Sequence, residues 1–262
     1  MKAVRPKKHL GQHFLKAPEI AQKIAALFTP NLVADLLEIG PGTGVLTQYL
    51  LPKAKRLHAI EVDEESVTYL KAHFTDTHFS ILAADFLNFD LSAYFKGKPF
   101  GVIGNFPYNI SSQIVFKVLE YREHIPFFGG MFQKEVAQRI CHAPGSKRYG
   151  ILSVLTQTYY EVNYCFTVPP GVFQPPPKVD SGVLVMHRKK TPLPSFDAQL
   201  YAKIVKTSFQ QRRKTIRNSL KTLGLPTNLT EDSIFDQRPE KLSVEAFISL
   251  TQKIENVGIS NR

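Results

Sequence analysis

Four consecutive residues, Asn105 to Tyr108, carry groups suited to holding the exocyclic amine of a nucleobase. Such an amine is a poor nucleophile because its lone pair is delocalised into the ring. The Asn105 side-chain oxygen and the Phe106 carbonyl could accept its hydrogens and favour a pyramidal nitrogen that is able to attack. Pro107 would turn this carbonyl outward, and the Tyr108 ring offers a surface for the base. The alternative interpretation is a plain proline turn at the end of a strand.

A glycine-rich turn lies upstream, in the run 38–44 with the sequence EIGPGTG. Glycines such as Gly40 and Gly42 let the backbone turn sharply and approach a ligand at a helix N-terminus, whose amides favour negative groups. A dinucleotide fingerprint would place its third glycine one residue later, where Val45 stands. The spacing therefore favours a nucleoside without a pyrophosphate, such as S-adenosylmethionine, over NAD. A purely structural turn from strand to helix is the alternative.

Two acidic residues follow at the ends of the next apolar runs. Glu61 lies 21 residues beyond Gly40, where a carboxylate can accept both hydroxyls of a ribose. Asp85 ends the third run, where it could bind an adenine amino group. Each alone is weak evidence, because acidic residues are also common helix caps. A glycine turn, a Glu and an Asp at three successive strand ends together indicate a nucleoside site.

The elements that must position these residues alternate along the chain. Apolar strand-like runs are expected at 32–39, 57–62, 79–83, 100–104 and 126–132. Helices are expected at 18–28, 45–51, 64–73, 112–121 and 134–142. Strands without polar alternation that alternate with helices predict a parallel sheet covered on both faces.

The pattern of predicted elements changes near Tyr149. A helix to about residue 158 is followed by two β-rich stretches, 162–168 and 179–187, which are expected to close the sheet with antiparallel strands. Prolines 192 and 194 then indicate a linker. We expect a first domain over 1–190, with a basic N-terminal arm, and a small helical domain over 191–262.

The basic charge is concentrated at both ends of the chain. The formal net charge is +11, and the first 18 residues hold five basic side chains and no acidic one. Residues 188–262 hold 14 basic and seven acidic side chains. This distribution predicts a polyanionic partner, with nucleic acid favoured over a membrane, whereas a solvated surface kept for solubility is the alternative.

A basic helix is expected over 212–223. It would place Arg213, Arg217 and Lys221 in one stripe, toward phosphates, beside an apolar stripe of Ile216, Leu220 and Leu223. A simple solvated face is the other possibility. The residues expected to contact RNA are Lys7, Lys8, Arg212, Arg213, Lys214, Arg217 and Lys221.

These motifs resemble those of class I, S-adenosylmethionine-dependent ribosomal RNA adenine dimethyltransferases. Within that group, the chain is most similar to the small-subunit enzymes of the kasugamycin-sensitivity family, which dimethylate two adjacent adenosines near the 3′ end. The segments that carry the resemblance span nearly the whole chain and are 11–15 (GQHFL), 38–44, 105–111, 133–136 (QKEV), 168–181 with PPPKVDS, and 209–220 with QRRKTIRN.

The resemblance implies a Rossmann-like, mostly parallel seven-stranded sheet followed by a small helical domain. It implies that the ring matching Phe173 covers the second face of a base stacked on Tyr108. His13 often appears as Asn in relatives, and Phe106 is commonly Leu or Pro, but backbone atoms could serve at both positions. The residues implied or expected to contact the cofactor are His13, Leu15, Gly40, Gly42, Glu61, Asp85 and Asn105, and those expected at the reacting amine are Asn105, Phe106, Pro107, Tyr108 and Phe173.

The expected activity is therefore N6,N6-dimethylation of adenosines in small-subunit ribosomal RNA during ribosome biogenesis. The expected protein is a cytoplasmic monomer that binds the small ribosomal subunit and has no membrane segment. No metal is expected, because the two cysteines have neither metal-ligand spacing nor a disulfide framework. Three alternatives stay open at this point. They are a large-subunit adenine methyltransferase of the macrolide-resistance type, a non-catalytic ribosome-assembly or transcription factor, and a methyltransferase that acts on protein glutamine.

Overall fold

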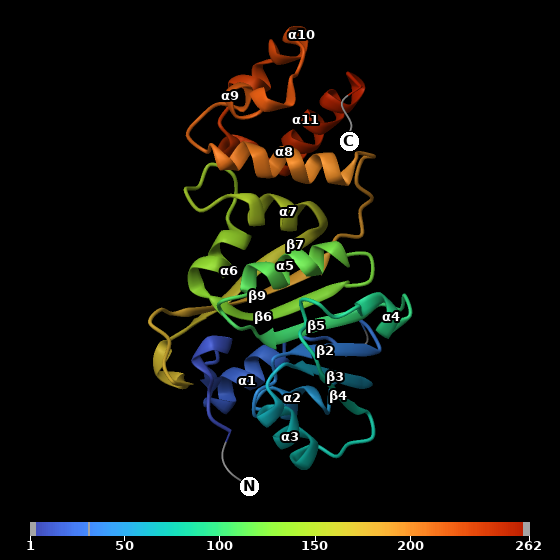
Figure 1. Cartoon of the computed structure of the whole chain (residues 1–262), viewed down its shortest axis with the longest axis vertical. Coiled ribbons are helices and arrows are strands. Elements are labelled where there is room, and N and C mark those ends of the chain that lie inside the picture. The colour runs from blue at the N-terminus through green and yellow to red at the C-terminus, as the bar shows by residue number, and fades with distance from the viewer. Residues whose placement is uncertain (1–3, 31, 259–262) are drawn as a thin grey trace. The chain divides into compact units, whose positions relative to one another are not determined.

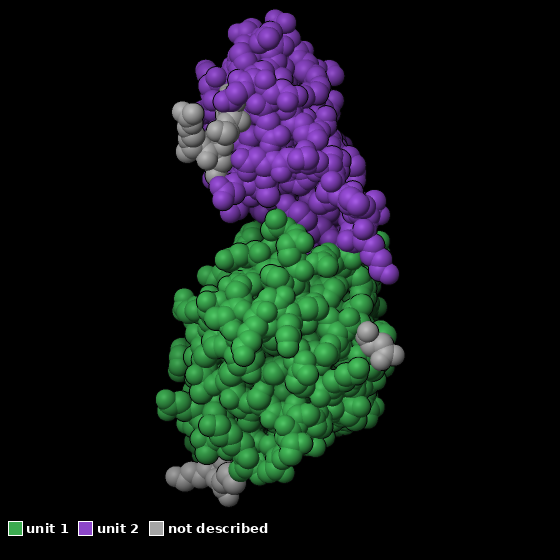
Figure 2. All heavy atoms as spheres, turned by 90° about the vertical axis from the view of Figure 1, so that its right-hand side faces the viewer, with its two compact units in different colours: residues 1–138, 161–188 green, residues 139–160, 189–262 purple. Residues whose placement is uncertain are grey.

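The computed structural model describes residues 4–30 and 32–258, so Lys2 of the basic arm lies outside the described residues. Within those residues the chain divides into two compact units (Figure 2). Unit 1 contains residues 1–138 and 161–188, and unit 2 contains residues 139–160 and 189–262.

Unit 1 has an α/β architecture built on one main sheet. In its described part, seven strands lie in the order β4-β3-β2-β5-β6-β9-β7, and the labels in Figure 1 follow this order. The first five in that order run parallel, and β9 pairs with β6 in the antiparallel direction. Their bounds are β2 (Asp35–Ile39), β3 (Arg56–Glu61), β4 (Phe79–Ala83), β5 (Phe100–Asn105), β6 (Phe127–Gln133), β7 (Tyr160–Val168) and β9 (Ser181–Arg188). The mostly parallel seven-stranded sheet predicted from the sequence is confirmed.

The central strands are mostly apolar because both of their faces are covered, although β2 also buries Asp35 and Glu38. Every residue of β2 is buried, and so are the first five of β5 and the first six of β6. A second, short sheet pairs β1 (Phe14–Leu15) with β8 (Phe173–Gln174). The helices here are α1 (Pro18–Ala25), α2 (Thr47–Leu50), α3 (Glu64–His73), α4 (Leu91–Phe95), α5 (Ser111–Glu120) and α6 (Lys134–Cys141), with the short 3-10 helices η1 (Lys8–Leu10) and η2 (Pro170–Val172).

Glycines of β5 and β6 make a hollow for one aromatic ring. A Cβ added at Gly130, whose φ is 145°, would lie 2.1 Å from the Gly104 carbonyl oxygen and 2.7 Å from Cε2 of Phe106. The Phe106 ring therefore lies directly over this glycine pair, and it stacks on Phe128 with ring centroids 5.0 Å apart and an interplanar angle of 4°. This packing anchors the turn that follows β5.

Unit 2 is helical. Its two longest described helices bury one face each, as the apolar periodicity predicts, whereas a third buries residues 152–156 without a break. The elements assigned to it, apart from the end of α6, are α7 (Ile151–Tyr159), α8 (Ala198–Gln210), α9 (Ile216–Ser219), η3 (Lys221–Leu223), α10 (Thr227–Thr230), η4 (Ser233–Asp236), η5 (Pro239–Lys241) and α11 (Val244–Asn256).

The division into units differs from the single boundary expected near residue 190. The chain does change units at Lys189, but α7 also belongs with the C-terminal helices, because it packs on α8 and α11. The Thr158 and Tyr201 hydroxyls are 2.7 Å apart, and Lys189 donates to the Gln157 carbonyl at 2.6 Å. Such contacts join segments that are far apart in the sequence, so local patterns could not reveal them.

The continuous basic helix expected over 212–223 is wrong. The chain turns after α8, Thr215 is extended, and a separate helix α9 begins at Ile216. The Ile216 amide donates to the Gln237 carbonyl at 2.8 Å, and Ile216 and Leu220 are fully buried. Burying these two side chains, together with this backbone bond, overrides the local helix pattern. Consequently Arg213, Arg217 and Lys221 do not form one helical stripe.

Candidate active site

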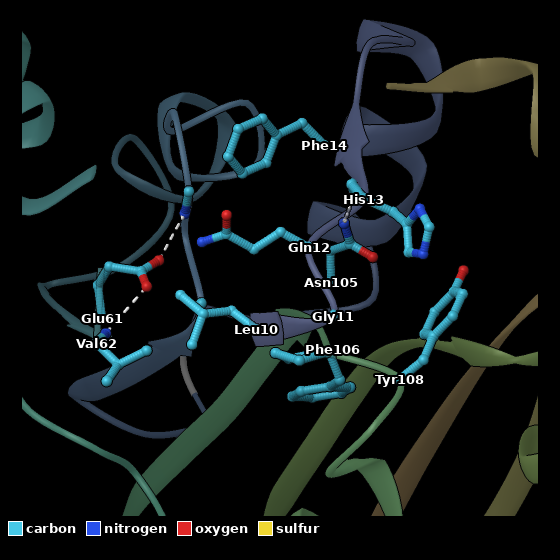
Figure 3. Close-up of a pocket in the computed structure, with 13 residues that line it drawn as sticks. Leu10, Gly11, Gln12, His13, Phe14, Glu61, Val62, Asn105, Phe106 and Tyr108 are labelled. Atoms are coloured by element: carbon cyan, nitrogen blue, oxygen red, sulfur yellow. Dashed lines mark hydrogen bonds between the residues drawn. The ribbon is translucent and has the colours of Figure 1, made fainter. Parts of the chain in front are cut away.

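The predicted site residues gather at the carboxyl ends of the parallel strands. In open α/β sheets, this edge is where ligands bind. A cavity here encloses about 460 Å³ that no atom fills, part of it open to solvent. Figure 3 shows the residues that line it, which are Leu10, Gly11, Gln12, His13, Phe14, Gly40, Gly42, Glu61, Val62, Asn105, Phe106, Pro107 and Tyr108.

Asn105 has a fixed orientation in this cavity. Its Nδ2 donates to the His13 carbonyl at 3.1 Å. Because the amide is planar, this bond directs the Oδ1 acceptor away from His13 O, and Figure 3 shows that oxygen on the side of the cavity where Tyr108 stands. The side chain is half-buried, so the acceptor faces a partly desolvated space. Asn105 is therefore arranged to accept a hydrogen bond from a ligand.

The rest of the turn presents a backbone carbonyl and an aromatic ring. Phe106 lines the cavity, and the residue as a whole is 1% exposed, with its ring packed on Phe128 below the turn. Tyr108 is half-buried, and its hydroxyl is hydrogen-bonded to that of Ser181, which holds the ring in place. Burial raises the pKa of Tyr108, so the phenol stays protonated. The ring is thus a neutral, fixed surface.

Glu61 has bonding capacity left for a ligand. Its Oε1 accepts from the Val62 and Asp63 amides at 2.9 and 3.0 Å, whereas Oε2 accepts from the Gly42 amide at 3.1 Å. Each carboxylate oxygen can accept two hydrogen bonds, so Oε2 can take a further donor. Burial raises the pKa of Glu61, although the three amides oppose that shift. A ligand that donates hydrogen bonds would favour the charged form.

A second cavity of about 380 Å³ adjoins the first. It shares Phe14, Gly40, Gly42 and Asn105 with the first cavity and adds Glu38. At Gly42, whose φ is 58°, a side chain would strain the backbone, and an added Cβ would lie 3.0 Å from the Phe14 ring, which would have to shift. The helix expected at 45–51 is the shorter α2 (Thr47–Leu50), and anion binding at its start stays a prediction.

Glu38 is a buried carboxyl group beside this second cavity. It is 1% exposed, and the Thr47 hydroxyl donates to its Oε2 at 2.7 Å. Burial, together with the nearby charge of Glu61, raises the pKa of Glu38 to about 8. Two desolvated carboxyl groups at one end of the sheet are an environment that favours a ligand with positive charge.

His13 and Leu15 reach the site through the N-terminal arm. The Nδ1 atom of His13 lies 2.8 Å from the Pro175 carbonyl, and because a carbonyl only accepts, Nδ1 carries the hydrogen. The His13 ring lies beside Tyr108, with centroids 5.4 Å apart. Leu15 lines the second cavity and pairs with Phe173 between β1 and β8. The arm is therefore part of the wall of the site.

Two predicted site residues are placed differently. Asp85 lines neither cavity, and its oxygens accept from the Leu87 amide at 2.9 Å and from Asn88 Nδ2 at 2.6 Å. Phe173 is 1% exposed and packs in the hydrophobic core with Leu15. The structure thus buries the Phe173 ring, which was expected to face the base. The Asp85 carboxylate is hydrogen-bonded within its own loop. A role for either residue in binding stays a prediction.

The basic residues divide into exposed and paired groups. Lys8, Arg213, Lys214 and Lys221 are exposed. Arg212 donates to the Ser146 carbonyl at 3.0 Å, and Arg217 pairs with Asp236 at 2.6 Å. Lys7 is bound to the Asp63 carboxylate, which raises the pKa of Lys7. For each of these three residues, a contact with RNA would have to replace the partner that it has within this chain.

Several lining residues were not singled out from the sequence. Gln12 and Phe14 stand in the GQHFL motif, which was the available signal, and Val62 follows Glu61 directly. Asp63, which caps α3, could have been noticed as an acidic residue before a helical run. Its partners in the arm could not, because they lie 51 and 56 residues away.

The described residues hold no cluster of three or more His, Cys, Asp or Glu side chains arranged to bind a metal ion. Over the same residues, no helix has the length and apolar character needed to cross a membrane.

The sheet order and the cavity at its carboxyl edge define a class I methyltransferase fold. A solved dimethyladenosine transferase from Plasmodium falciparum is similar to this chain, with a TM-score of 0.81, 25% identity, and coverage of 94% of this chain and 99% of that one. The solved 23S rRNA methyltransferase ErmE has a TM-score of 0.69 and 26% identity, over 92% and 99% of the two chains.

The amino-acid sequence places the chain more closely. The model of the family described as ribosomal RNA adenine dimethylase matches residues 3–255, and the chain belongs to this family, as the resemblance predicted. A protein of Flavobacterium johnsoniae named ribosomal RNA small subunit methyltransferase A is 56% identical over 100% of both chains. The protein of the same name from Bacteroides thetaiotaomicron is 54% identical over 97% of this chain and 96% of its own.

The raised pKa of Glu38 predicts that this side chain makes the stability of the protein depend on pH. Its folded-state pKa of about 8 lies above the ordinary value of 4.5. The free energy of unfolding that Glu38 contributes is therefore fully present below pH 4.5 and is lost as the pH rises toward 8. Glu38→Gln keeps a neutral side chain at every pH. In urea unfolding, we expect the free energy of unfolding of Glu38→Gln to rise relative to that of the parent by up to roughly 1.4 kcal/mol per pH unit through this window.

The exposed Glu120→Gln is the control for loss of an acidic side chain. A constant difference between Glu38→Gln and the parent from pH 4.5 to 8 would show that Glu38 is already ionised in the folded protein.

Proposed function

We propose that this chain transfers methyl groups from S-adenosylmethionine to N6 of two adjacent adenosines near the 3′ end of small-subunit ribosomal RNA, during ribosome biogenesis. The observation that carries the proposal is the Asn105 amide, whose donor is held by the His13 carbonyl so that its acceptor faces the cavity shared with Glu61. The small subunit is proposed because relatives at 56% and 54% identity are named for it.

The residues present fit this cofactor. S-adenosylmethionine carries positive charge and ribose hydroxyls, and it supplies a methyl group on a sulfonium. Glu61 Oε2 has an acceptor position left for a hydroxyl, and burial of Glu38 and Glu61 without a cation raises the pKa of each. Gly40 and Gly42 allow close approach of a ligand to the backbone. These four residues, with Asn105, are proposed to hold the cofactor, and His13 and Leu15 complete the wall.

The turn after β5 would activate the target amine. Asn105 Oδ1 and the Phe106 carbonyl accept its two hydrogens, which favours a pyramidal nitrogen with its lone pair available. Pro107 directs the turn, and Tyr108, held by Ser181, stacks against the base. The adenosine must leave its own stack to reach this cavity. No general base is required, because the amine becomes acidic once it is methylated.

The second transfer must also accommodate a methyl group. After the first methylation the amine keeps one hydrogen, so only one of the two acceptors can bind it, and the new methyl group takes the place of the other hydrogen. The Phe106 ring is buried beneath the turn and cannot move toward the cavity without leaving its hollow. Room for the methyl group must therefore lie on the open side of the turn.

RNA is proposed to contact the exposed basic side chains of each unit. Lys8 is an exposed lysine of the N-terminal arm, and Arg213, Lys214 and Lys221 follow α8 in unit 2. These exposed groups carry positive charge suited to phosphates. The cytoplasmic location and the monomeric state expected from the sequence stay predictions.

The function is tested by incubating the purified full-length protein with labelled S-adenosylmethionine and unmodified small ribosomal subunits, and mapping the methylated nucleotides by mass spectrometry. We expect N6,N6-dimethyladenosine at two adjacent positions near the 3′ end. Methylation of large-subunit RNA alone would favour the activity that the name of ErmE states. Subunit binding without any methyl transfer would favour the assembly-factor alternative.

Asn105→Ala should lower the single-turnover rate of methyl transfer by roughly 100-fold, as removal of one oriented hydrogen-bonding group in a catalytic site does. Binding of the small subunit should stay within a few-fold, because the basic residues hold the RNA. Asn105→Asp keeps an acceptor but loses the donor to His13, so its rate should lie between the two. Full activity of Asn105→Ala would exclude the proposed role, and a parallel loss of binding would indicate a structural turn.

Exposed and paired basic side chains are expected to have different effects on RNA binding. Replacing Arg213 and Lys214 with Gln should weaken subunit binding and reduce the slope of log affinity against log salt by roughly 0.7 to 0.9 for each lost phosphate contact. Arg217→Gln is the matched control, because that side chain is already paired with Asp236. Equal salt slopes for both variants and the parent would mean that this surface does not contact phosphate.

A further inference from the structure

The N-terminal arm, here residues 7–15, crosses the opening of the cavity from β3 to β8. Residues 10–14 line the cavity opposite Glu61, and Figure 3 shows the Gln12 side chain reaching across it toward the Glu61 side. The middle of the arm is bound by Asn105 through the His13 carbonyl. Its far end is held by the β1–β8 pairing. The near end requires a separate anchor.

That anchor is the Asp63 carboxylate. Oδ1 is bound by Lys7 Nζ, and Oδ2 accepts from Gln12 Nε2 at 3.3 Å. The Asp63 side chain is 0% exposed, and the Lys7 side chain is 30% exposed. Over the described residues, the side-chain hydrogen bonds and ion pairs that residues 7–12 make outside the arm end on Asp63 or its neighbour Glu65.

Hydrogen bonds within the arm join the residues that contact Asp63. The Lys7 amide donates to Gln12 Oε1 at 2.7 Å, and backbone bonds from Leu10 and Gly11 back to Lys7 and Lys8 close a compact loop. Lys7 and Gln12, the two residues that bind Asp63, therefore also bind each other. Losing one contact loosens the other, which makes the anchor cooperative.

Asp63 is also connected to the ligand side of the cavity. Its amide donates to Glu61 Oε1 at 3.0 Å, and its carboxylate caps α3 through the Glu65 amide and the Ser66 hydroxyl. Burial opposes ionisation of Asp63, but the bonds from Lys7, Ser66 and Gln12 outweigh it and hold the pKa below its usual range. The group is therefore a permanent anion beside the proposed ribose site.

We propose that Asp63 is a latch that holds the arm closed over the nucleoside cavity through Lys7 and Gln12, and that bound cofactor and spent product leave when these contacts open. The inference rests on the cofactor site proposed above. It assigns Lys7 to cofactor retention rather than to RNA. Asp63 is a positioning residue, because it acts through the arm and does not touch the reacting atoms.

The test is a chase experiment on the full-length protein without RNA. Protein loaded with labelled S-adenosylmethionine is mixed with excess unlabelled S-adenosylhomocysteine, and release of the label is timed. Lys7→Met and Asp63→Asn should each speed release by roughly tenfold, the effect of losing one hydrogen bond to a charged group. The double variant should be little faster than either single variant, because both break the same contact.

Matched variants separate the latch from other effects. Lys71→Met removes an exposed lysine of α3, the helix that Asp63 caps, and Asp90→Asn removes another helix-capping aspartate, on α4; both should release the label within twofold of the parent rate. In a single turnover of preloaded protein on small subunits, Lys7→Met should transfer methyl groups at the parent rate, since Asn105 to Tyr108 are untouched. Amide hydrogen exchange in residues 8–12 should be faster in Lys7→Met without any ligand.

Lys7→Met keeps the cap of α3 intact, so it tests the latch even where Asp63→Asn fails to fold. Release at the parent rate from Lys7→Met, or fully additive effects in the double variant, would overturn the latch. Failure of the parent protein to bind labelled cofactor would instead overturn the proposed cofactor site. Glu61→Ala, which should lose cofactor binding, confirms that the label reports on that site.

Discussion

The hydrogen bond from Asn105 Nδ2 to the His13 carbonyl is the contact on which the site depends. It joins the end of a central strand to the N-terminal arm, two segments 92 residues apart. It also decides which atom of the amide faces the cavity. An acceptor that faced the arm would leave the target amine with one partner, so the proposed chemistry requires this orientation.

Packing and electrostatics support that contact from two directions. Below the turn, the glycines of β5 and β6 leave space for the Phe106 ring, which fixes the backbone from which the neighbouring carbonyl is presented. Across the cavity, Glu38 and Glu61 are buried with pKa values raised by desolvation. The protein therefore keeps two poorly solvated carboxyl groups where a cation with hydroxyl groups is proposed to bind, at a cost in stability that a bound ligand would offset.

Sequence patterns predicted the sheet well because its buried parallel strands are mostly apolar. The strand at 79–83 has the expected bounds, and Glu61 and Asn105 stand at strand ends as expected. Local patterns failed where distant contacts decide. The basic run at 212–223 breaks because Ile216 is buried and bonded to Gln237, and Phe173 is buried by pairing with Leu15. Lys7 is a partner of Asp63, which no spacing in the sequence indicates.

The account's central claim, that the strand-edge cavity closed by the arm is the cofactor site next to the target amine, is tested most directly by a crystal structure with S-adenosylhomocysteine and adenosine. We predict the ribose hydroxyls of S-adenosylhomocysteine on Glu61 Oε2, the amine of the free adenosine within hydrogen-bond distance of Asn105 Oδ1 and the Phe106 carbonyl, and its base against Tyr108. A ligand bound away from Glu61, or an adenosine amine that contacts neither acceptor, would contradict the account.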